Sequence, residues 1–504
     1  MESLVFIWVL LRVFLALGLL AFGLYCGYIQ WVHVKYDHIP SAPRASFFFG
    51  HLPILWKMLK NKELVHDLFL QWAEEYGPVF RFNAFHRVSL FILSPEGIKE
   101  YLMLPQYPKD RFSYEHLHTV FGVRSLGNGL VTDCEYDHWH KQRRIMDPAF
   151  SRIYLIGLTE TFNDQAEELM MELEKKADGE TKVDVMDLLR RVTLDIIAKV
   201  AFGLELNTLH DEQTPFPHAV NLVMKGVTNS RMPLFKYMPG NRKTVREIQE
   251  SLRLLRRTGK ECIEKRQKAI QNGEEVPLDI LTQILKNAAQ EEHHDFENML
   301  DNFVTFFFAG HETTANQLSF AVMELSRHPD IVAKLQAEVD EVIGVKRDIA
   351  YEDLGKLVYL SQVLKEVLRL YPPVPDMMRW TGKENFIEGV RIPAGTTLIF
   401  STYIMGRLEK YFKDALTFNP DRFNKDQLKP YFSYFPFGLG PRSCIGQIFS
   451  QVEAKVVMAK FLQRFDFQLV PPQSFKAIGI GTLKPLDGVQ CRLKPRHQLV
   501  RKED

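Results

Sequence analysis

The feature that most constrains this chain is a glycine-rich loop that holds one cysteine near the C-terminus. The loop reads Phe437-Gly438-Leu439-Gly440-Pro441-Arg442-Ser443-Cys444-Ile445-Gly446, and an apolar helical pattern over residues 448–462 follows it. Its glycines permit a tight turn and the close approach of a flat ligand. The Arg442 cation, the loop N–H groups and the start of the next helix can stabilise a Cys444 thiolate. A cysteine taken alone is more often a buried structural residue, but the surrounding pattern favours a thiolate ligand for iron.

Composition narrows the class of protein. The chain has 504 residues, enough for two average domains or one large one, and its formal net charge is +1. Such a balance lacks the strong basic excess that is typical of nucleic-acid-binding proteins. The five cysteines are scattered, with no zinc spacing and no disulfide framework, which indicates a reducing compartment.

The N-terminus predicts a membrane helix. Residues 4–29 are apolar apart from Arg12, and about 20 such residues span a bilayer. A cleaved signal peptide is the alternative, but no small-residue cleavage site is present. Lys35 and Arg44 follow the helix and predict a cytosolic domain after a single membrane pass, whereas Arg12 either snorkels to the far surface or shortens the span. We therefore expect an anchor and hinge over residues 1–38 and one domain over residues 39–504.

A second motif lies inside a long helical pattern over residues 295–328, which Pro329 ends. Within it, Ala309-Gly310-His311-Glu312-Thr313-Thr314 places a glycine beside an acid and two hydroxyls. Glycine lets a helix open, and a threonine can bond back to a carbonyl one turn earlier. The resulting groove leaves room for a diatomic ligand and water, so that Glu312 and Thr313 can relay protons. Taken alone, this segment is equally typical of an ordinary amphipathic helix.

Several other residue pairs and segments are only weak indicators of function when each is taken alone. Trp139 and Arg143 share a helix face, as in a surface cation–π contact, and Glu366 and Arg369 share another, as in a surface ion pair. Short strands are predicted over residues 79–82 and 89–93, irregular structure over 112–130, and mostly helix over 155–271. The apolar insertion over residues 232–240 is bounded by prolines and either dips into a membrane surface or packs over the core.

Together and in this order, the motifs resemble those of the cytochrome P-450 superfamily. The resemblance implies a mainly α fold with a small β-region, haem b (iron protoporphyrin IX) as cofactor, and Cys444 as the iron ligand. The further residues that bind haem by this resemblance are Trp139, Arg143, Arg379, Phe437 and Arg442. A buried network of Glu366, Arg369 and Arg422 is implied behind the cysteine loop.

The resemblance also implies a monooxygenase. Glu312 and Thr313 then deliver protons for the reaction with O2, and an apolar pocket holds the substrate. The pocket candidates, for each of which ordinary packing is the alternative, are Leu117, Phe121, Leu126, Phe306, Ala309, Val374 and Thr482. Electrons come from a partner, expected to be NADPH-cytochrome P-450 reductase at the endoplasmic reticulum membrane, with Lys141, Arg144 and Lys455 as candidates for docking.

The substrate class is the narrowest expectation. Residues 275–286, 300–307 and 482–487 resemble the cholesterol 24-hydroxylases of the superfamily, which implies a sterol hydroxylated on its side chain. The chain departs from them at Pro375 and Asp376. A carboxylate at 376 must face outward, pair with a cation or meet a polar substrate group, since an unpaired buried charge is costly. A monooxygenase of other lipids or xenobiotics, a haem peroxide isomerase and a non-catalytic haem protein remain as alternatives.

Overall fold

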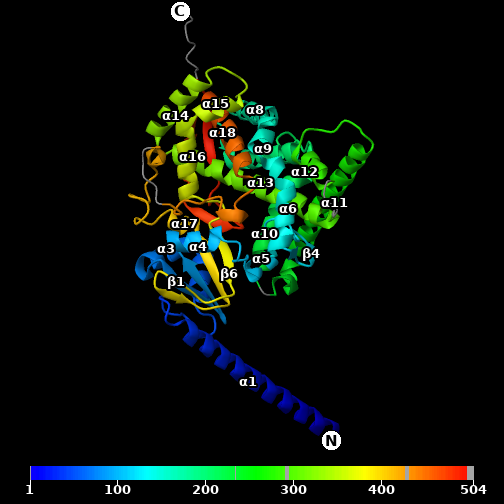
Figure 1. Ribbon diagram of the computed structural model, residues 1–504, viewed down its shortest axis with the longest axis vertical. Helices are drawn as coiled ribbons and strands as arrows, with labels where there is room; N and C mark the ends of the chain where they lie inside the picture. Colours follow the sequence, from blue (N-terminus) through cyan, green and yellow to red (C-terminus); the bar gives the residue numbers. More distant parts are fainter. Residues whose placement is uncertain (1, 233, 290–294, 426–430, 497–504) are drawn as a thin grey trace, which may run out of the picture.

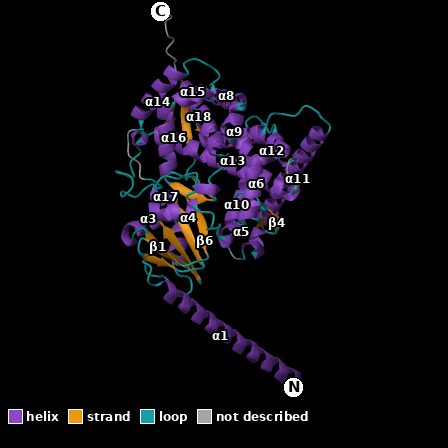
Figure 2. Cartoon of the chain, viewed as in Figure 1, coloured by secondary structure: helices purple, strands orange, loops and turns teal. Residues whose placement is uncertain are grey.

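The computed structural model describes residues 2–232, 234–289, 295–425 and 431–496 and confirms the mainly α fold class. Helices fill most of the body, and the largest sheet lies to one side, next to the point where the first helix leaves (Figures 1 and 2). The helices, with 3-10 turns written η, are α1 (Glu2–Tyr36), α2 (Leu52–Lys60), α3 (Val65–Tyr76), α4 (Pro95–Met103), α5 (Arg111–Glu115), α6 (Tyr136–Met146), η1 (Asp147–Phe150), α7 (Arg152–Ile156), α8 (Thr159–Glu174), α9 (Val185–Phe202), α10 (Pro215–Ser230), η2 (Phe235–Tyr237), η3 (Pro239–Asn241), α11 (Arg242–Gln271), α12 (Ile280–Ala288), α13 (Phe296–Leu325), α14 (Pro329–Val342), α15 (Tyr351–Lys356), α16 (Val358–Leu370), α17 (Thr402–Met405), η4 (Pro420–Phe423), η5 (Gly440–Arg442) and α18 (Gln447–Arg464).

The strands are short. They are β1 (Val79–Ala84), β2 (Arg87–Ile92), β3 (Thr119–Val120), β4 (Val123–Arg124), β5 (Val183–Asp184), β6 (Asp376–Thr381), β7 (Asn385–Ile387), β8 (Val390–Ile392), β9 (Thr396–Ser401), β10 (Phe465–Leu469), β11 (Ala477–Ile480), β12 (Thr482–Pro485) and β13 (Gln490–Pro495). The largest sheet has the order β1-β2-β9-β6, with only the β2–β9 pair parallel. A second sheet has the order β10-β13-β5, and the remaining strands form hairpins.

The main sheet is held by aromatic packing under α3. Phe80 and Phe91 stack with ring centroids 4.6 Å apart, and Phe69 of α3 lies 4.7 Å from Phe91. Aromatic and β-branched side chains favour such a half-buried pleated surface. Strands β1 and β2 contain the predicted strand segments, so this prediction is confirmed.

Helix α13 forms the centre of the helical region (Figure 1). Its N-terminus is capped by Asp295, whose side chain accepts a hydrogen bond from the Asn298 N–H, as residues of this type do at helix starts. Phe303 and Phe307 pack on Phe202 of α9, with centroids 4.1 and 5.3 Å away. The helix ends at Leu325, slightly before the predicted end at residue 328, because the residue before a proline disfavours helical geometry.

The segment over residues 112–130 is more ordered than predicted. Asp110 caps α5 by accepting from the Ser113 N–H at 2.8 Å. Strands β3 and β4 form a hairpin whose turn residues, Phe121 and Gly122, have φ values of 51° and 86°. Tight hairpins need positive φ at both turn positions, and this turn pattern was overlooked because Phe is an unusual first turn residue.

Helix α1 is long and apolar enough to cross a membrane. It projects away from the body (Figure 1), but its last turns are packed against the domain. Ile29 and Val32 are buried, and the Tyr36 hydroxyl lies 2.8 Å from the Thr396 hydroxyl. The expected hinge begins beyond this joint, where the Arg81 N–H donates to the Pro40 carbonyl. Thus the boundary at residue 38 falls within a packed region of the structure.

Candidate active site

The cysteine loop is folded tightly against its neighbours. Gly438 and Gly440 have φ values of 73° and 68°, and a Cβ atom at Gly440 would lie 2.2 Å from the Leu102 carbonyl oxygen. Glycine is therefore required at 440 both for the backbone conformation and for the close approach. The Cys444 N–H donates to the Phe437 carbonyl at 2.8 Å. The sulfur consequently has a position that the backbone sets.

Cys444 differs from the other cysteines in its surroundings. It is exposed, whereas Cys26, Cys134, Cys262 and Cys491 are intermediate or buried. Burial nevertheless raises the pKa of the Cys444 thiol, opposed by a Gly446 backbone N–H and the Arg143 charge. The sulfur is therefore accessible, although protein atoms surround it. A cationic iron placed there favours the thiolate, so the residues fit a flat iron-containing group.

Helix α13 presents one small accessible face. From Asn298 to Leu325, every residue is buried except Ala309, Gly310 and Thr313. The Thr313 hydroxyl donates to the Ala309 carbonyl at 2.7 Å, as the predicted back-bonding requires. The predicted opening of the helix is not seen, because α13 is continuous through Gly310. Gly310 instead allows close packing, since a Cβ there would lie 2.7 Å from the Ile197 side chain.

Glu312 lies in a polar cluster with α9 and β12. Its Oε1 atom is 3.1 Å from Arg190 Nη2 and accepts from the Thr482 hydroxyl at 3.2 Å, and Asn316 donates to the same hydroxyl. Burial acts to raise the pKa of Glu312, but the Arg190 charge and weaker neighbours lower it below the ordinary value. Glu312 is therefore ionised. Sequence reasoning missed Arg190 and Asn316, because nothing in the linear pattern relates α9 to residue 312.

Buried and half-buried cations gather near Trp139. The Arg442 guanidinium lies 4.1 Å from that ring centroid, its Nη1 donates to the Asp133 carbonyl, and its Nη2 has no partner. Burial and then the Arg379 charge lower the pKa of Arg442 to about 10. Burial, Arg442 and Arg379 likewise lower the pKa of Lys109, a residue that the sequence motifs missed. Such a cluster fits an anionic partner such as the carboxylates of haem.

Arg143 contacts the cysteine loop directly. Its Nη1 donates to the Ser443 carbonyl at 2.7 Å, and its Nε binds Asp147 at 2.5 Å. It thus holds the cysteine loop from α6. Trp139 is buried in the same helix and supports Arg442.

The structure brings Glu366, Arg369 and Arg422 together. Arg369 binds both carboxylate oxygens of Glu366 at 2.7 Å, and Arg422 Nε binds Oε1 at 3.0 Å. The Glu366 and Arg369 side chains are completely buried. The remaining Arg369 donors reach backbone carbonyls of the segment that precedes the cysteine loop, including Ala415. This is a buried structural network and not the surface ion pair of the alternative reading.

The pocket candidates occupy different environments. Val374 is 48% exposed, and Leu117 is partly buried. Phe121 stacks on Phe235 at 5.7 Å, Phe306 packs against Phe150 at 5.2 Å, and Leu126 is buried. Thr482 uses its hydroxyl on Glu312, so it has a polar role beyond lining a pocket.

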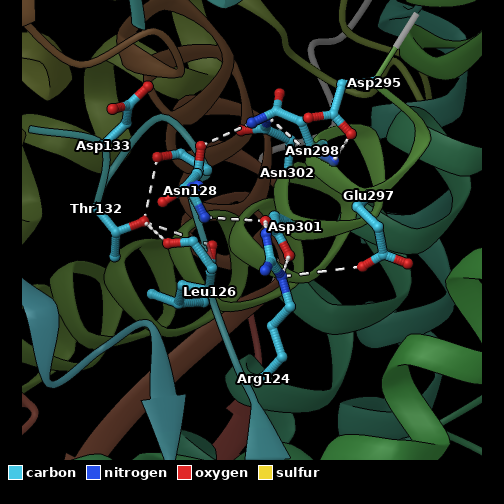
Figure 3. A network of polar contacts seen from close by, with 12 residues as sticks. Arg124, Leu126, Asn128, Thr132, Asp133, Asp295, Glu297, Asn298, Asp301 and Asn302 are labelled. Atoms are coloured by element: carbon cyan, nitrogen blue, oxygen red, sulfur yellow. Dashed lines mark hydrogen bonds and ion pairs between the residues drawn. The ribbon is translucent and has the colours of Figure 1, made fainter. Parts of the chain in front are cut away.

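A polar network ties the segment with Leu117, Phe121 and Leu126 to α13 (Figure 3). Asp301 is fully buried and forms ion pairs with Arg124 of β4 at 2.6 Å and with Arg256 of α11 at 2.9 Å. The Asn128 N–H also donates to Asp301 at 2.9 Å. One carboxylate therefore holds a loop and two helices together, an arrangement that satisfies a costly buried charge.

The expected docking cations are not equivalent. Lys141 and Arg144 are exposed on α6. Lys455 instead donates to the Leu354 carbonyl at 2.8 Å, and burial lowers its pKa. It is therefore a weaker candidate than sequence suggested. In the apolar insertion, Leu234, Tyr237 and Met238 are exposed, whereas Pro233 lies outside the described residues.

Comparison of the sequence with known proteins identifies the family to which the chain belongs. A family model described as Cytochrome P450 matches residues 40–489. Cytochrome P450 4d2 of Drosophila melanogaster is 30% identical over 488 residues, covering 91% of this chain and 94% of the relative. Cytochrome P450 72A11 of Arabidopsis thaliana is 32% identical over 500 residues, covering 91% and 94%. Echinocystic acid 23-monooxygenase of Saponaria officinalis is 30% identical over 491 residues, covering 90% and 91%.

Proposed function

This chain belongs to the cytochrome P450 family, and on that basis we propose that it hydroxylates a sterol on its side chain, with 24-hydroxylation of cholesterol as the specific reaction. As a family member it is a haem-binding monooxygenase that uses O2 and a redox partner. Two accessible apolar side chains carry the substrate proposal: Ala309 is exposed on α13, and Val374 is 48% exposed. We propose that they form an apolar wall of the substrate site. An apolar ligand gains about 25 cal/mol for each Å² that such a wall removes from water.

Two further points support a sterol. Residues 275–286, 300–307 and 482–487 resemble the cholesterol 24-hydroxylases, and Asp301 and Thr482 within them have defined structural roles. The Saponaria relative is named for oxidising position 23 of echinocystic acid, which supports reaction at one defined carbon.

Haem would be held by residues of the cysteine loop and its neighbours. Cys444 would provide the thiolate ligand, and Lys109, Arg379 and Arg442 would provide cations for the haem carboxylates. Arg442 has an unpartnered nitrogen for this purpose. Bound haem supplies the activation of O2 and the transfer of one oxygen atom to an unactivated C–H bond.

Proton supply is the part of the reaction that the chain itself performs. The Thr313 hydroxyl donates a hydrogen bond to the Ala309 carbonyl, so its oxygen is still able to accept one on the accessible face of α13. It can therefore hold a water in place there. Glu312 reaches Arg190, which is partly exposed, so a proton from solvent can enter at this ion pair. Transfer of a proton from the Glu312 carboxylate to the Thr313 hydroxyl then requires either a bridging water or a rotation of one side chain.

The partner and location follow from the same proposal. NADPH-cytochrome P-450 reductase would dock beside the exposed Lys141 on α6, and α1 would anchor the protein in the endoplasmic reticulum membrane with a single span. Deleting residues 1–24 removes most of the apolar span but keeps the Tyr36–Thr396 contact. This variant should lose most membrane binding in a flotation assay and keep its haem spectrum, whereas unchanged binding would contradict the anchor.

Turnover of a sterol panel with reductase, NADPH and O2 tests the substrate proposal. We expect cholesterol to shift the haem iron to high spin and to yield a side-chain alcohol identified by mass spectrometry. Fatty acids and drug-like molecules serve as comparison substrates. If they are turned over while all sterols are inert, the sterol proposal is wrong. Cys444→Ser tests the ligand assignment separately, because it should abolish the thiolate-type spectrum of the reduced carbon monoxide complex.

A further inference from the structure

Asp376 forms a pair with His66 that the catalytic scheme does not use. His66 Nε2 lies 2.9 Å from Asp376 Oδ2, and the two side chains are 11% and 17% exposed. The other polar atom of each residue, His66 Nδ1 and Asp376 Oδ1, is buried without a hydrogen-bond partner. An unsatisfied buried polar atom costs about 1–3 kcal/mol, so this pair is expected to receive a further polar group.

The pair is held rigidly. Asp376 is opposite Ser401 in the β6–β9 register, and the Thr402 N–H donates to the Pro375 carbonyl at 2.8 Å. His66 lies in the first turn of α3, with its ring 5.4 Å from the Tyr403 ring. Both partners therefore come from ordered elements, which is what a binding site for a defined group requires.

A cation lies in the neighbourhood of this pair, at the C-terminal end of α10. The Arg231 Nε donates to His116 Nε2 at 3.0 Å. Burial lowers the pKa of Arg231, and the nearby Asp376 charge opposes this effect, although the Arg231 side chain is exposed.

The same region adjoins the proposed substrate wall. Val374 is two positions before Asp376, and the Leu483 N–H of β12 donates to the Pro373 carbonyl at 2.9 Å. The tip of the β11–β12 hairpin approaches α10, since a Cβ at Gly481 would lie 2.7 Å from the Met224 side chain. The β11–β12 hairpin therefore contacts both the segment that precedes Asp376 and helix α10.

We propose that the His66–Asp376 pair, with Arg231 nearby, binds a neutral hydroxyl group on an otherwise apolar substrate. This inference rests on the proposed sterol function. A hydroxyl can donate to Asp376 and accept from a cation. A carboxylate or sulfate group would meet the Asp376 charge and be disfavoured by like-charge repulsion. The site thereby selects 3-hydroxysterols over acidic lipids.

The test compares matched ligands in matched variants. Dissociation constants are measured from the high-spin shift of the haem-loaded protein with cholesterol, with the analogue lacking the 3-hydroxyl group, and with cholesterol sulfate. In the native protein, we expect loss of the hydroxyl to weaken binding about tenfold. In Asp376→Ala and His66→Ala, the two neutral ligands should bind with nearly equal affinity. Asp466→Ala, which changes an exposed carboxylate on β10, should behave as the native protein.

Each outcome has a definite meaning. If the hydroxyl contributes equally in the native protein and in Asp376→Ala, or if cholesterol sulfate binds as tightly as cholesterol, the inference is overturned while the sterol function stands. If no sterol shifts the spin state, the proposed function fails, and this inference fails with it. Should Asp376→Ala load no haem, His66→Ala and Asp376→Asn provide the same comparison.

Discussion

The Thr313 hydroxyl is bonded to the Ala309 carbonyl at 2.7 Å, and these two residues form most of the accessible face of α13. The bond orients the oxygen lone pairs toward that face. We expect Thr313→Ala to keep haem and NADPH oxidation, but to lower product per NADPH about tenfold or more, since positioned proton donors contribute factors of about 100 to 10,000. Product and hydrogen peroxide are measured together.

Thr313→Ser is the control for this prediction because it keeps a hydroxyl at the same position. It should retain most of the coupling between NADPH oxidation and product. Native coupling in Thr313→Ala would show that Thr313 has no part in proton supply.

Glu366→Gln should destabilise the protein strongly. The change leaves Arg369 buried without its carboxylate, and removal of one partner of a buried pair costs about 3–5 kcal/mol. We expect less haem per protein and a lower thermal midpoint. Glu341→Gln, at an exposed position of α14, should leave both quantities unchanged. Equal stability of the two variants would show that the network does not support the cysteine loop.

Asp301→Asn should destabilise the segment over residues 117–130, which Asp301 ties to α13. The neutral amide loses its charge pairing with Arg124 and Arg256, and we expect a destabilisation of about 3 kcal/mol. Hydrogen exchange in residues 117–130 should accelerate more than in α18. Uniform acceleration across the chain, or none, would argue against a local clamp. Glu297→Gln is the matched control, because that carboxylate contacts Arg256 from an exposed position.

The protein should be sensitive to acid through His51. Its Nε2 lies 3.0 Å from the Ala42 carbonyl and its Nδ1 accepts from the Asn83 N–H, so the neutral ring is the bonded form. Burial lowers the pKa of His51 from 6.5 to about 4. The unfolded chain binds this proton first, so the stabilisation is complete above about pH 6.5 and falls as the pH drops toward 4. The loss is on the order of 3 kcal/mol.

Thermal midpoints measured across this pH window check the prediction. His51→Gln should flatten the profile, whereas His218→Gln, at an exposed position of α10, should not. If the thermal midpoint of His51→Gln depends on pH as that of the native protein does, the loss of stability in acid belongs to other groups. Candidates are His116 and His311, whose pKa values burial also lowers to about 4.

Local features of the sequence predicted local features of the structure. The strands at residues 79–82 and 89–93, the central helix and the Thr313 back-bond depend on neighbouring residues alone, so they were predictable. The hairpin at Phe121 was missed because its turn chemistry is unusual.

Site features that depend on distant segments were harder to predict. Arg190 and Glu312 are 122 positions apart, and no linear pattern connects them. Lys109 joins Arg379 and Arg442 only after the chain has folded. The contacts of Arg143 with the Ser443 carbonyl and Asp147 were not predicted either, and its expected role at a haem carboxylate stays a prediction. The contact between Asp376 and His66 spans 310 positions and was equally hidden.

The cations beside Trp139 also bear on how the protein matures. Lys109, Arg379 and Arg442 repel one another in the folded chain, and the nearby carboxylate of Asp133 is already engaged by Gln142. Folding without an anionic group must therefore work against this repulsion. A ligand that binds only the folded form adds its binding energy to stability. Acquisition of haem and completion of the fold are accordingly one coupled equilibrium, and a shortage of haem in the cell would appear as a shortage of folded enzyme.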